Sequence, residues 1–216
     1  MDSHIMILVR ISQAAVLVPL VIGFLRKKLL NREQKLLLLL ASISLLSEIS
    51  AFILDFHFSL NNLLIYNCYN IIWFIILILI YRKVLRYYFF PHLHIFLIGG
   101  FLLFAVGNMM LLQPPSAFNT NSIGLALSIF MILSLLFFHK DLTSNVNLTM
   151  KNRPLLWLNT GIFLYSSGTL LLFLFINQII ESGSEIMIWL WGLNAFLNIL
   201  LNAFYAMALG IKPAAP

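Results

Sequence analysis

Residues 36–55 read LLLLLASISLLSEISAFILD, twenty residues in which the only charged side chains are Glu48 and Asp55. A run of this length matches the roughly 20 residues that a helix needs to cross about 30 Å of hydrocarbon. Residues 75–80 read IILILI, again without a polar break. Strands of a membrane β-barrel would alternate apolar and polar side chains. Continuous runs favour helices, which satisfy their own backbone hydrogen bonds in lipid.

The composition extends this interpretation to the whole chain. Of its 216 residues, 62% are hydrophobic and 9% are charged, whereas soluble domains carry about 25% charged residues. The sequence therefore predicts an all-α, polytopic membrane protein, with residues 1–216 forming a single bundle of seven transmembrane helices. The expected spans are Ile5–Leu25, Lys35–Asp55, Leu63–Ile80, Leu93–Leu112, Thr120–Phe138, Leu155–Ile176 and Ile186–Leu209. The first span is expected to be retained, because its basic cluster follows the apolar run instead of preceding it.

Basic residues occupy every second gap between the expected spans. They are Arg26, Lys27, Lys28, Arg32 and Lys35 in the first gap, Arg82, Lys83 and Arg86 in the third, Lys140, Lys151 and Arg153 in the fifth, and Lys212 in the tail. Lys and Arg are retained on the cytoplasmic side, so we expect a multi-pass protein of the inner (cytoplasmic) membrane, with its N-terminus outside and its C-terminus inside. The basic residues at the cytoplasmic ends of the helices explain the net charge of +6. They predict contact with anionic lipid head groups and not with nucleic acid.

Three ionisable side chains lie within the expected spans: Arg10, Glu48 and Asp55. Each costs at least about 2.5–3.5 kcal/mol in mid-membrane, so such groups usually face the bundle interior and have a partner. Glu48 and Asp55 are seven residues apart, and two helical turns place them on one face. One interpretation is a charged site in which Glu48 carries a proton or binds a cation, or Arg10 holds an anion. The other is an ion pair of Arg10 with Asp55 or Glu48 that joins the first two spans.

Amide and aromatic side chains gather in the third, sixth and seventh spans. Asn194, Asn198 and Asn202 recur every four residues and therefore lie along one side of a helix. Such residues either join helices by hydrogen bonds worth about 0.6 kcal/mol each on average, or line a polar pocket with apolar walls. On the second interpretation, the predicted ligand-binding residues are Glu48, Tyr66, Asn70, Tyr165, Trp191, Asn194 and Asn198.

The usual signatures of catalysis and cofactor binding are missing from the sequence. The last span has no lysine for a retinal Schiff base, because Lys212 lies beyond its end, and the last two spans have no His for zinc. The chain also has no Gly-rich phosphate loop, Ser nucleophile motif or HExxH. Cys68 is the single cysteine, and we interpret it as a small, buried hydrophobic residue. We therefore predict no catalytic residue, no metal site and no cofactor.

Two stretches resemble a known group of membrane proteins. Residues 157–168, WLNTGIFLYSSG, and residues 194–202, NAFLNILLN, are similar to small bacterial seven-helix proteins of the inner membrane whose function is uncharacterised. The resemblance is best in the last two spans and loose over the second to the seventh. Such proteins are associated with sensor kinases, so the resemblance implies a sensory role and no established activity.

Three functions remain open from the sequence. The first is a ligand-binding or sensory module, in which a small amphiphile or lipid enters from the outer half and a signal passes through the basic inner loops to a cytoplasmic partner. The alternative is a small-solute transporter around the same residues, with a three-plus-one-plus-three arrangement of helices. An intramembrane enzyme ranks third, because no nucleophile and base stand at a recognisable spacing.

Overall fold

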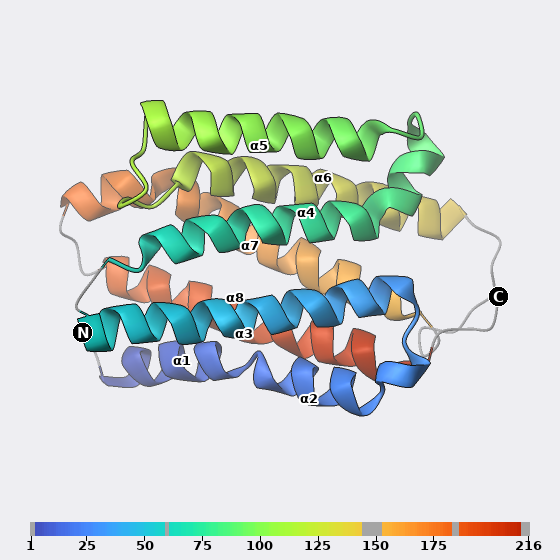
Figure 1. The fold of residues 1–216 in the computed structure, drawn as a ribbon, viewed down its shortest axis with the longest axis horizontal. Helices are drawn as coiled ribbons and strands as arrows, with labels where there is room; N and C mark the ends of the chain where they lie inside the picture. The colour runs from blue at the N-terminus through green and yellow to red at the C-terminus, as the bar shows by residue number, and fades with distance from the viewer. Residues whose placement is uncertain (1–2, 59–60, 144–152, 183–185, 213–216) are drawn as a thin grey trace.

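The computed structural model describes residues 3–58, 61–143, 153–182 and 186–212, and these residues are helical apart from short connections. The elements are α1 (Ser3–Ala14), α2 (Leu17–Leu25), the 3-10 turn η1 (Lys27–Leu29), α3 (Arg32–Phe58), α4 (Leu63–Tyr88), α5 (Leu93–Leu111), α6 (Thr120–Thr143), α7 (Pro154–Ser182) and α8 (Ile186–Gly210). The long helices lie side by side along one axis (Figure 1). The all-α prediction is confirmed for the described residues.

Six helical segments in the described part of the chain are long and apolar enough to cross a membrane. They are His4–Leu25, Arg32–Phe58, Leu63–Tyr88, Leu93–Leu111, Thr120–Thr143 and Ile188–Gly210. This is the pattern of a multi-pass membrane protein, and each segment coincides with an expected span. The remaining expected span falls within α7, which has 29 residues, more than the roughly 20 needed to cross a bilayer.

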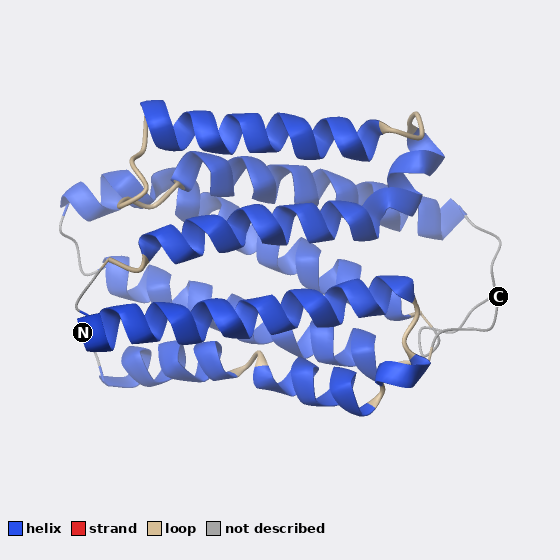
Figure 2. Ribbon diagram, viewed as in Figure 1, coloured by secondary structure: helices blue, strands red, loops and turns tan. Residues whose placement is uncertain are grey.

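The first expected span is broken into two helices, which the sequence prediction missed. α1 ends at Ala14 and α2 begins at Leu17, and the short interruption is drawn in tan in Figure 2. Pro19 lies in the first turn of α2. Proline has no backbone N–H and clashes with the turn before it, so it is tolerated there but would disrupt a helix interior.

The helices form a ring with one helix outside it. α8 packs against α1, α2, α3 and α7, while α4 packs against α3 and α6, and α6 against α7. α5 packs against α4 and α6 at the edge of the bundle (Figure 1). The interior of the ring is therefore enclosed by α1, α3, α4, α6, α7 and α8.

Glycines let α7 and α8 approach closely. A Cβ atom at Gly161 would lie 2.5 Å from the Cβ of Phe204, and one at Gly168 would lie 2.7 Å from a methyl group of Leu197. Small residues allow this kind of close helix packing in membranes. At Gly99 and Gly100, by contrast, an added Cβ atom would meet no atom within 4 Å. Both glycines are exposed on α5.

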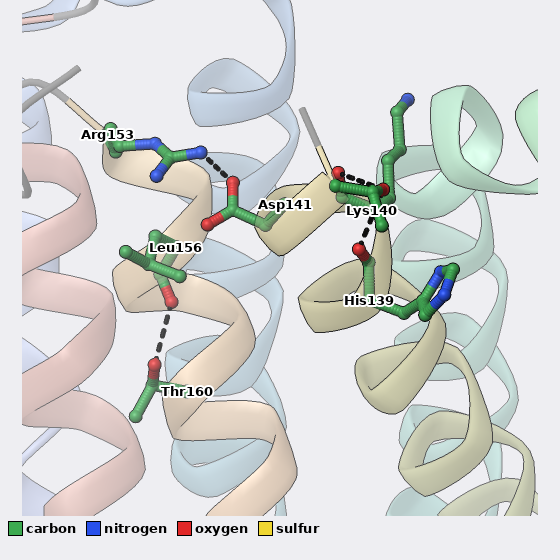
Figure 3. Close-up of polar contacts among 7 residues, drawn as sticks. His139, Lys140, Asp141, Arg153, Leu156 and Thr160 are labelled. Carbon is green, nitrogen blue, oxygen red and sulfur yellow. Dashed lines mark hydrogen bonds and ion pairs between the residues drawn. The ribbon is translucent and has the colours of Figure 1, made fainter. Parts of the chain in front are cut away.

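The two ends of the bundle differ in charge. One end, here called the basic end, holds the α2–α3 and α4–α5 connections, the end of α6, the start of α7 and the end of α8. The N-terminus lies at the other end, here called the N-terminal end (Figure 1). Two ion pairs lie at the basic end: Lys83 Nζ is 2.7 Å from Glu33 Oε1, and Arg153 contacts Asp141 (Figure 3).

A cap at the basic end ties α3 to α8. Asn31 and Gln34 form a capping box, in which the Gln34 N–H donates to Asn31 Oδ1 (2.8 Å) and the Asn31 N–H to Gln34 Oε1 (3.1 Å). This arrangement satisfies two backbone donors that the first turn of a helix leaves free. Gln34 Nε2 also donates to the carbonyl oxygens of Ala208 (2.7 Å) and Ile211 (2.9 Å). The start of α3 and the end of α8 are thereby held together.

A buried hydrogen-bond cluster joins three helices in the basic half. The Tyr81 hydroxyl of α4 lies 3.0 Å from Ser134 Oγ of α6 and donates to Asn159 Oδ1 of α7 at 2.6 Å. Asn159 Nδ2 donates to the Ser134 carbonyl oxygen at 3.2 Å. All three residues are buried. Each polar side chain in this cluster has a partner from another helix, as buried polar groups in an apolar interior require.

Candidate functional site

A cavity of about 330 Å³ lies inside the ring of helices. Its size is within the range of about 300–1,000 Å³ that small-molecule sites have. It is lined by all seven predicted ligand-binding residues: Glu48, Tyr66, Asn70, Tyr165, Trp191, Asn194 and Asn198. The other lining residues are Val9, Ser12, Gln13, Ser44, Asn67, Tyr69, Trp73, Phe118, Ile123, Leu127, Ala195 and Leu201. The structure thus brings the predicted set together around one space.

The elements around the cavity are more numerous than the sequence predicted. The expected pocket lay between the second, third, sixth and seventh spans, which are α3, α4, α7 and α8. The structure adds α1, through Ser12 and Gln13, and α6, through Ile123 and Leu127. Ser12 and Gln13 are polar residues inside an apolar span, and that signal could have placed them at the site. Phe118 lies in the α5–α6 connection and carried no such signal.

Glu48 is the acidic residue of the cavity wall. It is partly buried on α3, and the Tyr66 hydroxyl of α4 donates to its Oε2 at 3.3 Å. Seven residues separate Glu48 from Asp55, so Glu48 lies about 10 Å further into the bundle, at 1.5 Å per residue. The carboxylate has two oxygens with about four acceptor positions. The contacts with Tyr66 and Gln13 therefore leave acceptor positions of the carboxylate available to a ligand.

The expected ion pair of Arg10 with Asp55 or Glu48 is not formed in the described part of the chain. Arg10 is exposed, and its Nη1 donates to Gln13 Oε1 one turn along α1 at 3.3 Å. Asp55 is exposed near the end of α3. Neither residue lines the cavity. Both lie close to a helix end, where long charged side chains reach the interface at little cost, so neither requires an internal partner.

Asn194, Asn198 and Asn202 form a column of amides along α8. This amide column both joins helices and lines the cavity, the two roles considered from the sequence. Asn198 Nδ2 donates to Ser12 Oγ at 2.9 Å and to the Ser12 carbonyl oxygen at 3.3 Å. Asn202 Nδ2 donates to the Asn198 carbonyl oxygen at 2.9 Å. The two bonds from Asn198 to Ser12 hold α8 to α1 just before the break in the first span, where neighbouring side chains commonly satisfy freed backbone groups. Asn194 is different: its buried Oδ1 accepts no hydrogen bond from the described residues.

Aromatic side chains form much of the remaining wall. Trp73 of α4 meets Tyr165 of α7 with ring centroids 6.4 Å apart and an interplanar angle of 69°. Phe118 and Trp191 are paired at 5.7 Å. Both centroid distances lie within the 4.5–7 Å range of favourable aromatic pairs. The aromatic residues therefore give the cavity rigid apolar walls, with faces that carry partial negative charge.

An amide network fixes the rim of the cavity at the N-terminal end. Asn67 Nδ2 donates to the carbonyl oxygens of Pro115 (3.2 Å) and Ala117 (3.1 Å) in the α5–α6 connection. Asn108 donates to Gln113 Oε1 at 2.9 Å and also bonds Asn119. Through these bonds the connection is anchored to α4 and α5. Phe118, which follows Ala117, is held over the cavity as a result.

Cys68 does not lie where the sequence suggested. It is exposed on the surface of α4, so the expectation of a buried cysteine is wrong. Its neighbours Asn67 and Tyr69 both line the cavity, which turns the side chain of Cys68 toward the outside of the bundle.

A second, smaller cavity of about 150 Å³ lies at the basic end, between α4, α6 and α7. Its lining includes Lys83, Lys140 and Asp141 together with Tyr81 and Asn159. Asp141 and Lys83 are engaged in the ion pairs described above, and Lys140 extends away from Asp141 (Figure 3), with its Nζ 4.8 Å from the centre of the Tyr87 ring. The charged groups that line this smaller cavity are thus in contact with other side chains of the protein. The larger cavity is the better candidate for a ligand site.

Comparison of this chain with protein-family models, with curated proteins and with solved structures finds no match. The fold and the cavity are therefore the grounds on which a function is proposed, and the sequence resemblance to bacterial seven-helix proteins stays a prediction.

Proposed function

We propose that this chain is a seven-span membrane protein that binds a small amphiphilic ligand in the α1–α3–α4–α6–α7–α8 cavity and acts as a sensory module. The observation that carries the proposal is the convergence of seven predicted residues, from four helices, on one cavity of about 330 Å³. Membrane helices that served only as scaffolding would pack such polar groups against one another, as the helices do around Asn159.

The proposed orientation places the N-terminus and the cavity toward the outside and the basic end toward the cytoplasm. The charged clusters at the start of α3, the end of α4 and the start of α7 all lie at the basic end, in agreement with the retention of Lys and Arg in the cytoplasm. Glu48 then lies in the outer half, open to a ligand from the outer leaflet. On this proposal the protein spans the inner membrane of a bacterium.

A path from the cavity to the basic end runs along α8. Asn194 and Asn198 line the cavity, and the far end of the same helix receives two hydrogen bonds from Gln34 at the start of α3. A ligand that displaces α8 would therefore also move the basic α2–α3 connection. We propose that a cytoplasmic signalling partner contacts this connection.

Ligand binding is tested with a variant that fills the cavity. Ser44→Phe places a large ring in the space while leaving the amide column intact, and Cys68→Phe is the matched control on the exposed surface. Purified protein in nanodiscs is titrated with radiolabelled decylammonium, decanol and decanoate, and binding to empty nanodiscs is subtracted. The proposal requires saturable binding of at least one probe that Ser44→Phe abolishes and Cys68→Phe retains. It is wrong if no probe shows binding of this kind.

A transporter is the second candidate, and the break between α1 and α2 favours it. Discontinuous helices beside a binding site are a feature of many secondary transporters, and here Ser12, just before the break, lines the cavity and bonds Asn198. Proteoliposome uptake of tetramethylammonium, mannitol and gluconate tests this function, with Glu48→Gln and Asp55→Asn as a matched pair. Uptake that only Glu48→Gln abolishes establishes transport. Saturable probe binding without uptake supports the sensory module.

A further inference from the structure

The cavity wall holds a carboxyl group and no basic side chain among the described lining residues. Glu48 is the one acidic residue among the described lining residues, and no Lys, Arg or His stands beside it in the wall. Arg10, the nearest basic residue along the first span, is engaged with Gln13 at the surface. A carboxylate within a bilayer normally has a cationic partner. The described part of the protein does not supply one for Glu48.

The polar groups of the wall also include acceptors that lack donors. Asn194 Oδ1 is buried and accepts no bond from the described residues, and the two oxygens of Glu48 keep free acceptor positions beside their contacts with Tyr66 and Gln13. The Nδ2 of Asn198, by contrast, donates to Ser12 Oγ. A buried acceptor without a donor destabilises the protein, because it has lost its hydrogen bonds to water. A ligand that carries donors would satisfy these oxygens.

The aromatic walls favour the same kind of ligand. Trp73, Tyr165 and Trp191 line the cavity together with Phe118, and the faces of such rings attract cations within about 6 Å. Aliphatic side chains also line the cavity, among them Ile123, Leu127 and Leu201 from α6 and α8. The lining thus offers a negative and aromatic region for a charged head and apolar side chains for a hydrocarbon tail.

We infer that the ligand of this cavity is a cationic amphiphile of the alkylammonium class, whose ammonium group pairs with Glu48 and donates to Asn194 Oδ1. This inference rests on the proposed ligand-binding function. An anionic ligand would face the carboxylate with no cation in the wall. An uncharged ligand would leave the carboxylate without a counter-charge.

The test compares probes that differ only in the head group. Decylammonium, decanol and decanoate share one tail, and their binding to wild-type protein in zwitterionic nanodiscs is measured by equilibrium dialysis with radiolabel. We expect decylammonium to bind roughly tenfold or more tightly than decanol, and decanoate to show no saturable binding. This ratio needs no variant, so it holds whether or not a substitution disturbs folding.

Two variants on α3 provide the matched control. Glu48→Gln and Asp55→Asn each remove one negative charge, but only Glu48 lines the cavity. Glu48→Gln should weaken decylammonium binding about tenfold and leave decanol binding within about twofold, whereas Asp55→Asn should change neither. Equal affinities for decylammonium and decanol, with no effect of Glu48→Gln, would overturn the cationic ligand and leave a neutral-ligand site standing. If no probe binds in a way that Ser44→Phe removes, the proposed function itself fails.

Discussion

The two halves of this bundle use the same polar residue types in opposite ways. In the basic half, Asn159 bonds both Tyr81 and Ser134, and all three side chains are buried and satisfied. In the N-terminal half, Asn194 has a buried oxygen without a partner among the described residues, and Glu48 faces the cavity with acceptor positions left free. An amide that is paired across helices stabilises the fold. An amide that faces a cavity without a partner is available to something that enters.

The largest loss of stability is expected at Gly161, where α7 and α8 approach closely. Gly161→Leu would force a Cβ to within 2.5 Å of the Cβ of Phe204, an atom fixed to the α8 backbone. Overpacking costs about 1–3 kcal/mol and occasionally more, and we expect a loss of about 3 kcal/mol or greater in the free energy of unfolding, measured by SDS titration in mixed micelles. Gly99→Leu, on open surface, is the control and should change stability by less than about 0.5 kcal/mol. Equal losses at both sites would contradict the close approach of α7 and α8.

Replacement of one asparagine in each half compares the two regions directly. Asn159→Leu removes two hydrogen bonds and should cost about 1–2 kcal/mol of unfolding free energy. Asn194→Leu removes a side chain whose oxygen has no partner in the described structure, so it should be neutral or slightly stabilising in the same SDS titration. A loss at Asn194 equal to that at Asn159 would show that Asn194 is bonded within the protein, and the distinction between the halves would fail.

The helical fold could be predicted because it depends on composition and run length. The expected start of α4 at Leu63 agrees with the structure, and that of α6 at Thr120 does as well. The end of α4 was placed too early, at Ile80 instead of Tyr88. Arg82 and Lys83 mark the end of the apolar run. A helix can continue past that point into water, and hydropathy does not indicate where it ends.

The gathering of the site residues could be predicted because helical spacing places i, i+4 and i+7 residues on one face. Asn194 and Asn198 on α8 and Glu48 on α3 follow that rule. The contribution of α1 was not predicted, because the prediction rested on ionisable side chains and on the polar residues of the third, sixth and seventh spans, whereas Ser12 and Gln13 lie in the first. The contribution of Phe118 depends on the bonds of Asn67 to the α5–α6 connection, and contacts that distant in sequence cannot be read from one helix alone.

A smaller effect is expected at the junction between the halves. Asn198→Ala would remove the bonds to Ser12 at the end of α1, at a cost of about 0.6 kcal/mol for each hydrogen bond on average. Thermal unfolding in detergent should show a modest decrease in Tm, smaller than that of Asn159→Leu. Asn202→Ala, which removes bonds within α8 only, is the matched control and should lower Tm less. An unchanged Tm for Asn198→Ala would mean that the break in the first span does not depend on α8.

The smallest effect is expected at the rim of the N-terminal half. Asp55 is exposed and forms no ion pair with Arg10 in the described structure, so Asp55→Asn should change the free energy of unfolding by less than about 0.5 kcal/mol. Arg10→Gln should behave in the same way, and the double variant should equal the sum of the two. SDS titration of all three variants measures the coupling as a double-mutant cycle. A coupling of about 1 kcal/mol or more would restore the α1–α3 ion pair considered from the sequence, and Arg10 would then be close enough to compete with a cationic ligand for Glu48.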